Sequence, residues 1–484
     1  MPTRRKFIAQ STATALSATR GVQASGQAPA PHTRPNILWI CTDQQRWDTI
    51  HALGNPYIRT PNIDRLVETG VAFTHAHCQS TICTPSRASF MTGMYPGTVH
   101  GCFNGNEQWE HAAPLITKIL ADTGYDCGLA GKLHLAAAQG RIEPRPDDGY
   151  RVFDWSHHPS DNWPEGHAYI NWLEEQGHTY KALKEQYGYI PADLHQTTWC
   201  TDRTIDFIRE TRTGPWLFSL NCYDPHPPFD PPQEYVDRFN PNDLPGPLFR
   251  ESDLNVQQQL ESVQFNTRAR RYDADEAKLH QAQYWAQIEL IDENVGRILQ
   301  ALEDTGQREN TLIIFTSDHG EMAGDHGLRK KGCRFFEGLV RVPLIFSWPG
   351  MVKENLHSSA LVELLDIVPT LLDCAGLKTP ETMQGKSLLP LLTGSVAPDF
   401  HKEYVRCEFY FKSYATMIRN KQYKLVNYHG LQYGELFDMQ DDPGEFRNLW
   451  DMKEYREIRT ELMIRNFDAL AFAVDKGSPQ IAAW

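Results

Sequence analysis

The sequence predicts an α/β fold in which helices sandwich a large, mainly parallel sheet, with a smaller antiparallel sheet towards the C-terminus. Three observations support this prediction. Short continuous apolar runs, typical of parallel strands buried on both faces, recur along the chain. Segments with apolar residues at helical spacing lie between these runs. After Gly376 the pattern changes to short strands separated by tight turns.

The expected parallel strands share a polar or charged sequence directly after each apolar run. Four runs end in this way: 36–41 before Asp43 and Gln44, 125–130 before Lys132 and His134, 216–222 before Asp224 and His226, and 311–315 before Asp318 and His319. Another buried strand is expected at 342–348. Because ligands of open α/β sheets bind beyond the carboxyl ends of the strands, we expect these polar side chains to form one site.

The remaining elements define the expected domain organisation. Helices are expected at 115–122, 282–302 and 362–374, the last ended by Gly376. Four later strands are expected at 403–410, 414–419, 422–427 and 434–438, before a terminal helix at 455–472. A single core rarely grows beyond roughly 250–300 residues. The chain of 484 residues therefore predicts a catalytic α/β domain at 35–376 and an α+β subdomain at 377–484.

The segment 1–30 has the features of an export signal. A basic start is followed by a weakly apolar stretch of small residues and by Val22-Gln23-Ala24. Arg4 and Arg5, followed by Phe7, resemble a twin-arginine signal. A disordered leader is the alternative, and Arg20 in the middle of the segment favours it. We expect a periplasmic or secreted protein, with a cytoplasmic location as the alternative.

Composition excludes several classes of partner and site. The net charge of -14 argues against nucleic acid or an anionic membrane as the main partner. No run approaches the roughly 18 apolar residues of a membrane span. The ten cysteines include no C-x-x-C pair, so they predict neither a zinc ribbon nor a compact disulfide scaffold.

Cys83 begins the stretch Cys83-Thr84-Pro85-Ser86-Arg87. Pro85 suits the first turn of a helix, which places Cys83 at or near a helix N-terminus, where the amides and the dipole favour an anion. A core thiol would have more apolar neighbours. Zinc binding with His75, His77 and Cys78 does not match a known finger spacing. A thiolate nucleophile remains open, because a helix N-terminus can activate cysteine.

The motif C-x-P-S-R, followed by Thr92-Gly93, resembles the modification signature of the type I sulfatases of the alkaline phosphatase superfamily. In that family the cysteine is oxidised to formylglycine. Further segments resemble family motifs in the family's order, over nearly all of the chain from Pro35 to Leu449: Asp43-Gln44, Gly131-Lys132-Leu133-His134, Pro225-His226-Pro227, Asp318-His319, Lys331 and Glu435-Leu436-Phe437-Asp438. Four residues differ from the family's usual pattern. Leu133 stands where the family usually has tryptophan, and Cys127 where it often has Ser or Thr. Gln44 and His319 stand where many members have Asp and Asn.

The resemblance implies an alkaline phosphatase-like fold, sulfate ester hydrolysis and a role for each site residue. Asp43, Gln44, Asp318 and His319, with the modified Cys83, would hold one divalent metal. Oxygen ligands favour Ca²⁺, with Mn²⁺ or Mg²⁺ as alternatives. A formylglycine-generating enzyme would be the maturation partner. The other implied roles are orientation of the formylglycine hydrate by Arg87, sulfate binding by Lys132 and Lys331, and proton uptake by His134. His226 would either hydrogen-bond the ester or protonate the leaving oxygen.

The substrate is expected to be a sulfated carbohydrate or a small sulfate ester. Aromatic and imidazole side chains follow the segment that carries Lys132 and His134, and they would line a groove for sugar rings: Trp155, His157, His158, Trp163, His167 and Trp172. Ordinary packing of a large loop is the alternative. Two other functions stay open, namely a phosphonate or phosphate diester hydrolase with the same metal chemistry, and a sulfated-glycan binding protein that has lost catalysis.

Overall fold

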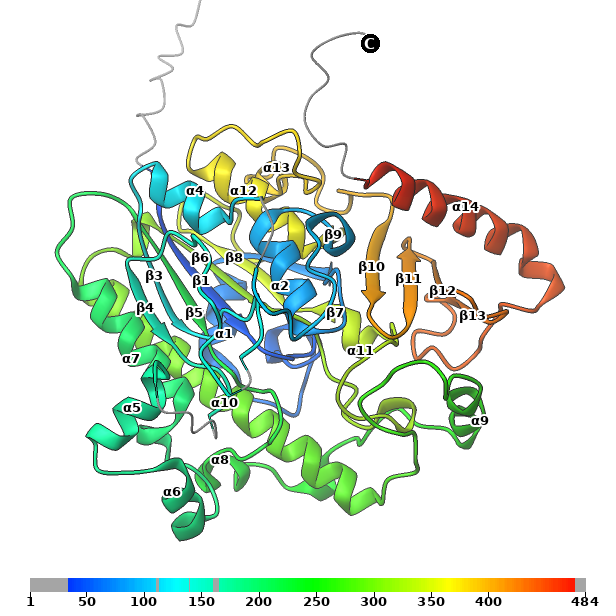
Figure 1. Cartoon of the computed structure of the whole chain (residues 1–484), viewed down its shortest axis with the longest axis horizontal. Coiled ribbons are helices and arrows are strands. Elements are labelled where there is room, and N and C mark those ends of the chain that lie inside the picture. The colour runs from blue at the N-terminus through cyan, green and yellow to red at the C-terminus, as the bar shows by residue number, and fades with distance from the viewer. Residues whose placement is uncertain (1–33, 110–112, 139, 160–164, 475–484) are drawn as a thin grey trace, which may run out of the picture. The chain divides into compact units, whose positions relative to one another are not determined.

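A computed structural model describes residues 34–109, 113–138, 140–159 and 165–474 of the chain. The expected export signal at 1–30 lies outside these residues. From Arg34 onwards the chain forms one compact unit, which contains a nine-stranded sheet and a separate four-stranded sheet (Figure 1). Among the described helices, none combines the length and the apolar character that crossing a bilayer requires.

The large sheet has the strand order β4-β3-β5-β1-β6-β8-β2-β7, with β9 paired to β2. The half from β4 to β6 is parallel, whereas β8 runs antiparallel to both β6 and β2. The mainly parallel α/β fold is therefore confirmed. Its strands are β1 (Asn36–Thr42), β2 (Gly70–His77), β3 (Asp126–Gly131), β4 (Val152–Trp155), β5 (Trp216–Asn221), β6 (Thr311–Ser317), β7 (Arg341–Val342), β8 (Leu344–Ser347) and β9 (Leu356–Glu363).

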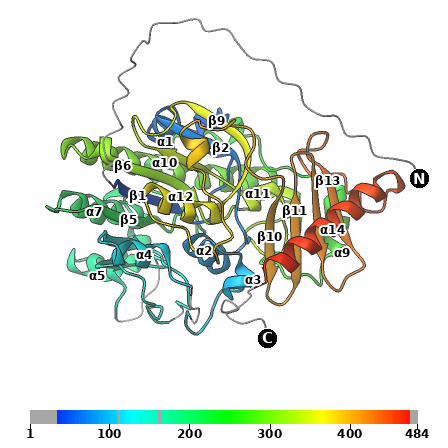
Figure 2. The same ribbon diagram turned by 90° about the horizontal axis from the view of Figure 1, so that it is seen from above.

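Helices cover both faces of this sheet (Figures 1 and 2). Alternate residues of β1 enter opposite cores, since Ile37 and Trp39 pack in one cluster and Leu38 and Ile40 in the other. The first core includes α2 (Cys83–Thr92), α4 (Ile116–Asp122) and α12 (Ile367–Cys374), and the second includes α1 (Pro61–Glu68), α5 (Ala168–Glu175), α7 (Gln196–Arg209) and α10 (Ala274–Asp304). The other helices are α3 (Pro96–Val99), α6 (Tyr180–Tyr187), α8 (Gln233–Val236), α9 (Glu251–Gln259), α11 (Glu337–Val340), α13 (Leu389–Leu392) and α14 (Arg456–Phe472).

Three expectations about these elements need correction. The helix expected at 362–374 begins only at Ile367, because Val362 and Glu363 still pair with β2 as part of β9. The helix expected at 282–302 starts earlier, at Ala274, where the Asp273 side chain accepts the first free backbone N–H groups. The strand expected at 342–348 contains β8, which is antiparallel to its neighbours.

The small sheet follows the large one in the chain and is antiparallel throughout. It consists of β10 (Val405–Tyr410), β11 (Tyr414–Arg419), β12 (Tyr423–Tyr428) and β13 (Gly434–Asp438) in sequential order, with α14 packed against it. Buried ion pairs attach it to α11: Arg419 Nη1 lies 2.8 Å and Lys424 Nζ 3.1 Å from the Glu337 carboxylate. Figure 2 shows this sheet beside the large one.

Candidate active site

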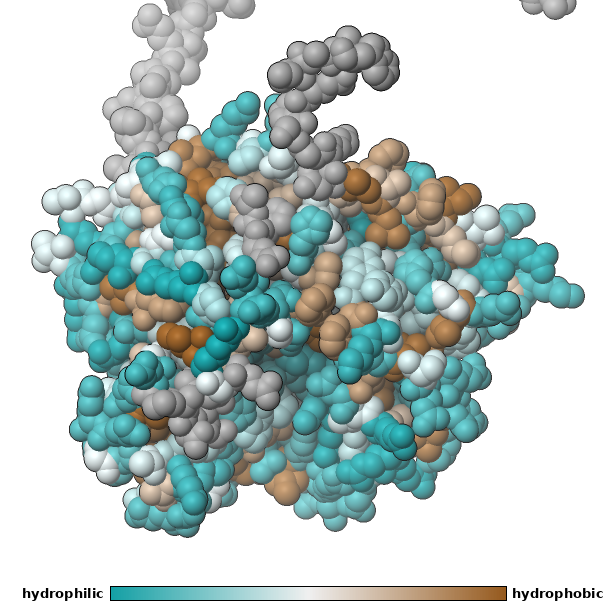
Figure 3. All heavy atoms as spheres, in the orientation of Figure 1, coloured by the Kyte–Doolittle hydropathy of each residue, from teal (hydrophilic) through white to brown (hydrophobic). Residues whose placement is uncertain are grey.

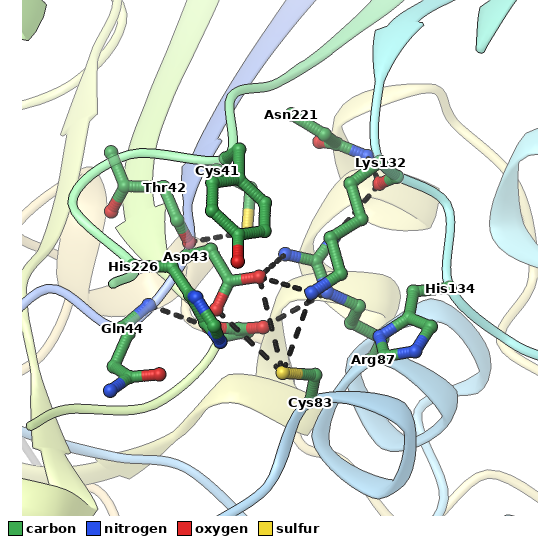
Figure 4. Close-up of polar contacts among 12 residues, drawn as sticks. Cys41, Thr42, Asp43, Gln44, Cys83, Arg87, Lys132, His134, Asn221 and His226 are labelled. Atoms are coloured by element: carbon green, nitrogen blue, oxygen red, sulfur yellow. Dashed lines mark hydrogen bonds and ion pairs between the residues drawn. The ribbon is translucent and has the colours of Figure 1, made fainter. Parts of the chain in front are cut away.

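The polar residues at the four strand ends meet at one edge of the large sheet (Figure 4). Thr42 lies opposite Ser317 in the β1–β6 register, so the residues that follow, Asp43 and Asp318, are neighbours. The N-terminus of α2 brings in Cys83 and Arg87. The structure thus gathers all ten expected site residues, which are Asp43, Gln44, Cys83, Arg87, Lys132, His134, His226, Asp318, His319 and Lys331.

Four of these residues form a buried set of potential metal ligands. One ligand atom each from Asp43, Cys83, Asp318 and His319 lies within 4.8 Å of the other three. Two carboxylates with an imidazole nitrogen suit a divalent cation, and the carboxylate oxygens favour Ca²⁺ or Mg²⁺. Burial opposes ionisation of Asp43, but Lys132 and Lys331 outweigh it and hold the pKa of this carboxyl well below its usual range.

Gln44, next to Asp43 in the chain, has a buried side-chain oxygen that could join this set. Its φ of 73° turns the chain sharply after Asp43, and its backbone N–H donates to Asp318 Oδ1 at 3.0 Å. The side-chain Nε2 donates to the Glu321 carboxylate. Gln44 Oε1 is buried and has no hydrogen-bond partner among the described residues. A buried carbonyl oxygen without a partner is costly, and a bound cation would satisfy it, so the donor set fits a metal.

Cys83, a member of the ligand set, also lies close to two ammonium groups. Its Sγ is 3.3 Å from His319 Nε2, 2.8 Å from Lys331 Nζ and 3.6 Å from Lys132 Nζ. Burial and Asp43 raise the pKa of the thiol, but the two lysines and His319 outweigh them and lower it to about 5. The surroundings of this atom therefore favour negative charge.

Arg87 is fixed by contacts to both carboxylates. Its Nε donates to Asp318 Oδ2 at 2.9 Å, and Nη2 lies 3.7 Å from Asp43 Oδ2. Nη1 donates to the Lys132 carbonyl at 2.9 Å, which ties α2 to the end of β3. A buried guanidinium with these partners is held rigidly beside Cys83.

His134 is held at a positive φ of 58° by a buried carboxylate. Glu143 accepts the backbone N–H groups of His134, Leu135 and Ala136 at 2.6, 2.9 and 3.2 Å. Burial, and then Lys132, lower the pKa of His134 well below its usual range, so the imidazole is neutral. Its Nδ1 is buried without a hydrogen-bond partner in the described part of the chain, which leaves this atom available to accept a proton.

His226 follows β5 and points towards Asp43 (Figure 4). Its Nδ1 lies 2.7 Å from the Pro227 carbonyl, which assigns the ring proton to Nδ1 and leaves Nε2 for the site. Burial and Lys331 lower the pKa of His226 well below its usual range. Asp224, at the end of the same strand, has a structural role instead. Its carboxylate accepts hydrogen bonds from Thr197 Oγ1 and, at 2.9 Å, from Gln287 Nε2.

The structure distinguishes Lys331 from its neighbour. Lys331 is buried with its ammonium against Cys83 and His319. Lys330 is exposed, has a φ of 67°, and donates its backbone N–H to Glu321. Lys331 is therefore the lysine that faces the site.

Sequence reasoning missed two buried acids that support the site, Glu143 and Glu321. Glu321 follows Asp318 by three residues and could have been suspected as part of the same turn. Glu143 lies in a stretch without periodic pattern, and nothing local marks it as the acceptor for the His134 loop.

The aromatic segment after β3 differs from the groove that we expected. Trp155 is buried, and its indole N–H donates to Glu143 at 2.9 Å, so this side chain packs inside the protein. His157 and His158 are half-buried, with rings 4.9 Å from those of His134 and Tyr223 respectively. Trp163 lies outside the described residues. Of the described residues of this segment, His157 lies beside the site through the contact of its ring with that of His134.

Comparison with known proteins agrees with this geometry. The family model described as Sulfatase matches residues 35–377, and that of N-sulphoglucosamine sulphohydrolase, C-terminal, matches residues 324–470. An arylsulfatase from Clostridium perfringens is 30% identical over 447 residues, which cover 88% of this chain and 92% of that protein. An N-acetylglucosamine-6-O-sulfatase from Bacteroides thetaiotaomicron is 28% identical over 506 residues, covering 89% of this chain and 85% of that protein.

A solved structure extends the comparison to the fold. The phosphonate monoester hydrolase of Agrobacterium radiobacter superposes with a TM-score of 0.80 at 26% identity, covering 92% of this chain and 97% of that one. The family match spans more than half of the chain and includes every residue of the site. The chain therefore belongs to the sulfatase family of the alkaline phosphatase superfamily and is a sulfuric ester hydrolase.

Proposed function

We propose that this protein hydrolyses sulfate monoesters with a formylglycine made from Cys83 and one divalent metal, Ca²⁺ by preference, with Mn²⁺ or Mg²⁺ as alternatives. One observation supports this most directly. The Cys83 Sγ atom, which stands in for the formylglycine oxygens, lies among three other potential ligand residues and two ammonium groups in a buried site. Asp43, Gln44, Asp318 and His319 would hold the metal together with the modified residue. The metal would polarise the attacking hydroxyl and a sulfate oxygen.

The hydrate of formylglycine would supply one hydroxyl for attack on sulfur, with departure of the alcohol, and a second whose deprotonation would release sulfate and restore the aldehyde. Arg87, fixed by Asp318, orients the side chain at position 83. Lys132 and Lys331, whose Nζ atoms lie 3.6 and 2.8 Å from Sγ, neutralise the sulfate oxygens. His134 accepts a proton at its unpartnered Nδ1.

His226 delivers the proton to the leaving alcohol. Its Nδ1 proton is engaged by Pro227, so Nε2 acts when it has taken up a second proton. Burial disfavours that cation in the free protein, and the negative charge of a bound sulfate ester favours it. The protonated ring would therefore form with the substrate in place.

Peptide mass spectrometry across 82–87 tests this proposal. Protein made together with a formylglycine-generating enzyme is expected to contain the aldehyde at position 83, and its activity towards an aryl sulfate is expected to rise with the modified fraction. Active protein that contains only cysteine at this position would overturn the proposal. Cys83→Ala serves as the inactive reference.

A second candidate is the hydrolysis of phosphonate or phosphate diesters. The 0.80 TM-score with a phosphonate monoester hydrolase favours it, because such substrates carry the same single negative charge and need the same metal chemistry. The two candidates are separated by kcat/KM for 4-nitrophenyl sulfate and for a 4-nitrophenyl phosphonate monoester, measured on one preparation. Preference for the phosphonate would replace the sulfatase proposal.

We extend the proposal to location, substrate and domain organisation. The twin-arginine-like start suggests export to the periplasm or medium, where sulfated carbohydrates would be the substrate, as the sulfatase from Bacteroides thetaiotaomicron is named for a sulfated sugar. Segments 35–376 and 377–484 would be the catalytic domain and the C-terminal subdomain. Cell fractionation of the full chain and of an Arg4→Lys, Arg5→Lys variant tests export. Equal cytoplasmic distribution of both would contradict it.

A further inference from the structure

Two exposed phenylalanine rings stack on each other outside the described site. The centroids of Phe103 and Phe411 are 5.5 Å apart with an interplanar angle of 29°, and the residues are 39% and 36% exposed. Phe103 follows α3, whereas Phe411 lies in the turn between β10 and β11. Large aromatic side chains are usually well buried. A stacked pair at the surface, assembled from two distant segments, therefore suggests a binding role.

The loop that carries Phe103 is attached to two parts of the site. The Asn104 side chain accepts the backbone N–H of Thr84, the residue after Cys83, at 2.9 Å. The Asn106 carbonyl accepts the N–H of Ala137 at 2.7 Å, in the same loop as His134. Phe103 is thus fixed between the N-terminus of α2 and the His134 loop.

The turn that carries Phe411 is attached to a segment that contacts Lys331. The Lys412 N–H donates to Gln264 Oε1 at 3.3 Å, and the Gln264 N–H donates to Ser413 Oγ at 2.8 Å. Two residues further on, the Asn266 N–H donates to the Lys331 carbonyl at 3.1 Å. Because Lys331 Nζ contacts Cys83, these bonds connect the segments that carry both rings to residues around Cys83.

The charge beside this pair is positive. Lys412 is exposed, and its Nζ lies 5.6 Å from the centroid of the Phe411 ring. An apolar platform next to an ammonium group is complementary to a pyranose ring, which has an apolar C–H face and, in a sulfated glycan, anionic substituents. The face drawn in Figure 3 is mostly hydrophilic, with hydrophobic side chains in scattered patches.

We infer that Phe103 and Phe411 form a stacking subsite for a sugar ring next to the sulfate ester that is cleaved, with Lys412 binding a further anionic group of the same chain. This inference rests on the proposed sulfatase function and specifies its substrate class as sulfated oligosaccharides. A small aryl sulfate would occupy only the inner pocket and would not reach the pair.

The test separates the subsite from the catalytic step. Binding of sulfated tetrasaccharides derived from heparan, chondroitin and carrageenan is measured calorimetrically in a Cys83→Ala background, and turnover of 4-nitrophenyl sulfate is measured in the Cys83 protein. Phe103→Ala and Phe411→Ala are compared with Phe467→Ala, which removes an exposed ring from α14 (71% exposed). Circular dichroism verifies that each variant is folded.

We expect each subsite variant to weaken binding of at least one tetrasaccharide by about 3- to 10-fold, the usual contribution of an aromatic contact. Turnover of 4-nitrophenyl sulfate should stay unchanged in both, and Phe467→Ala should affect neither property. Unchanged tetrasaccharide binding, no binding by the parent protein, or equal losses for both probes would overturn the subsite. Absence of aryl sulfate turnover in protein carrying formylglycine would instead contradict the proposed function, while the binding data still decide on the subsite.

Discussion

Glu143 offers the most direct test of how the fold supports the site. This carboxylate, 2% exposed, accepts three consecutive backbone N–H groups of the His134 loop and the indole N–H of Trp155. Removing it in Glu143→Ala leaves four buried donors without an acceptor, at about 1–3 kcal/mol each, or roughly 8 kcal/mol in sum. Burial raises the pKa of Glu143 despite these bonds. Deleting the charge therefore recovers part of its desolvation cost, and we expect a net loss of about 4 kcal/mol.

Glu143→Gln separates the contribution of charge from that of shape. The amide keeps one acceptor oxygen but places an NH₂ group against N–H donors, so we expect about 2 kcal/mol of destabilisation. In Glu143→Gln, displacement of the His134 side chain should lower kcat/KM for an aryl sulfate by about 10- to 100-fold, since small displacements of positioned groups reduce rates strongly.

Urea unfolding followed by tryptophan fluorescence, together with steady-state kinetics, provides both readouts. Glu174→Gln, an exposed residue on α5, is the matched control and should stay within about 0.5 kcal/mol of the parent. If Glu143→Gln unfolds at the same urea concentration as the parent and keeps its kcat/KM, the carboxylate does not hold the loop and the reasoning is refuted.

Three further predictions follow from the same contacts. Lys331→Ala should lower kcat/KM by about 100-fold or more, whereas the adjacent exposed Lys330→Ala should change it less than about 3-fold; equal effects would contradict the assignment of the lysine. Glu321→Gln should weaken metal binding by about 10- to 100-fold, measured by calorimetric titration of Ca²⁺ into chelator-treated protein, because Glu321 orients Gln44. The ion pairs of Glu337 should stabilise the fold above pH 4.5 and lose this effect as the pH falls towards its depressed pKa, so the stability of Glu337→Gln in urea should vary less with pH than that of the parent.

The strand ends were predictable because their signal is local. The runs before Asp43 and Asp318 are apolar throughout, which indicates burial on both faces without knowledge of neighbours. β2 escaped prediction because GVAFTHAH, at 70–77, includes polar residues and owes its place in the sheet to partners far along the chain. The start of α12 was misplaced for the same reason, since Val362 is a strand residue only through its pairing with Ala76.

The residues of the candidate site also differ in whether local sequence identifies them. Residues that define motifs, such as Cys83 and Lys132, could be identified from spacing and resemblance. Glu143 could not, because its importance lies in donors that the fold brings to it. The aromatic pair of Phe103 and Phe411 depends on a contact between residues about three hundred positions apart, which no local pattern encodes.

The separation of the two halves of the site along the chain has a consequence for biosynthesis. Cys83 lies in α2, whose ten residues are all buried, and its partner His319 follows 236 residues later. At roughly 5–20 residues per second, a ribosome needs about 10–50 s to synthesise that interval. During this time β6 does not yet exist, α2 lacks much of the surface against which it packs, and the thiol is accessible. Completion of the sheet then encloses Cys83, so any enzyme that modifies this residue works within a period that the length of the chain sets.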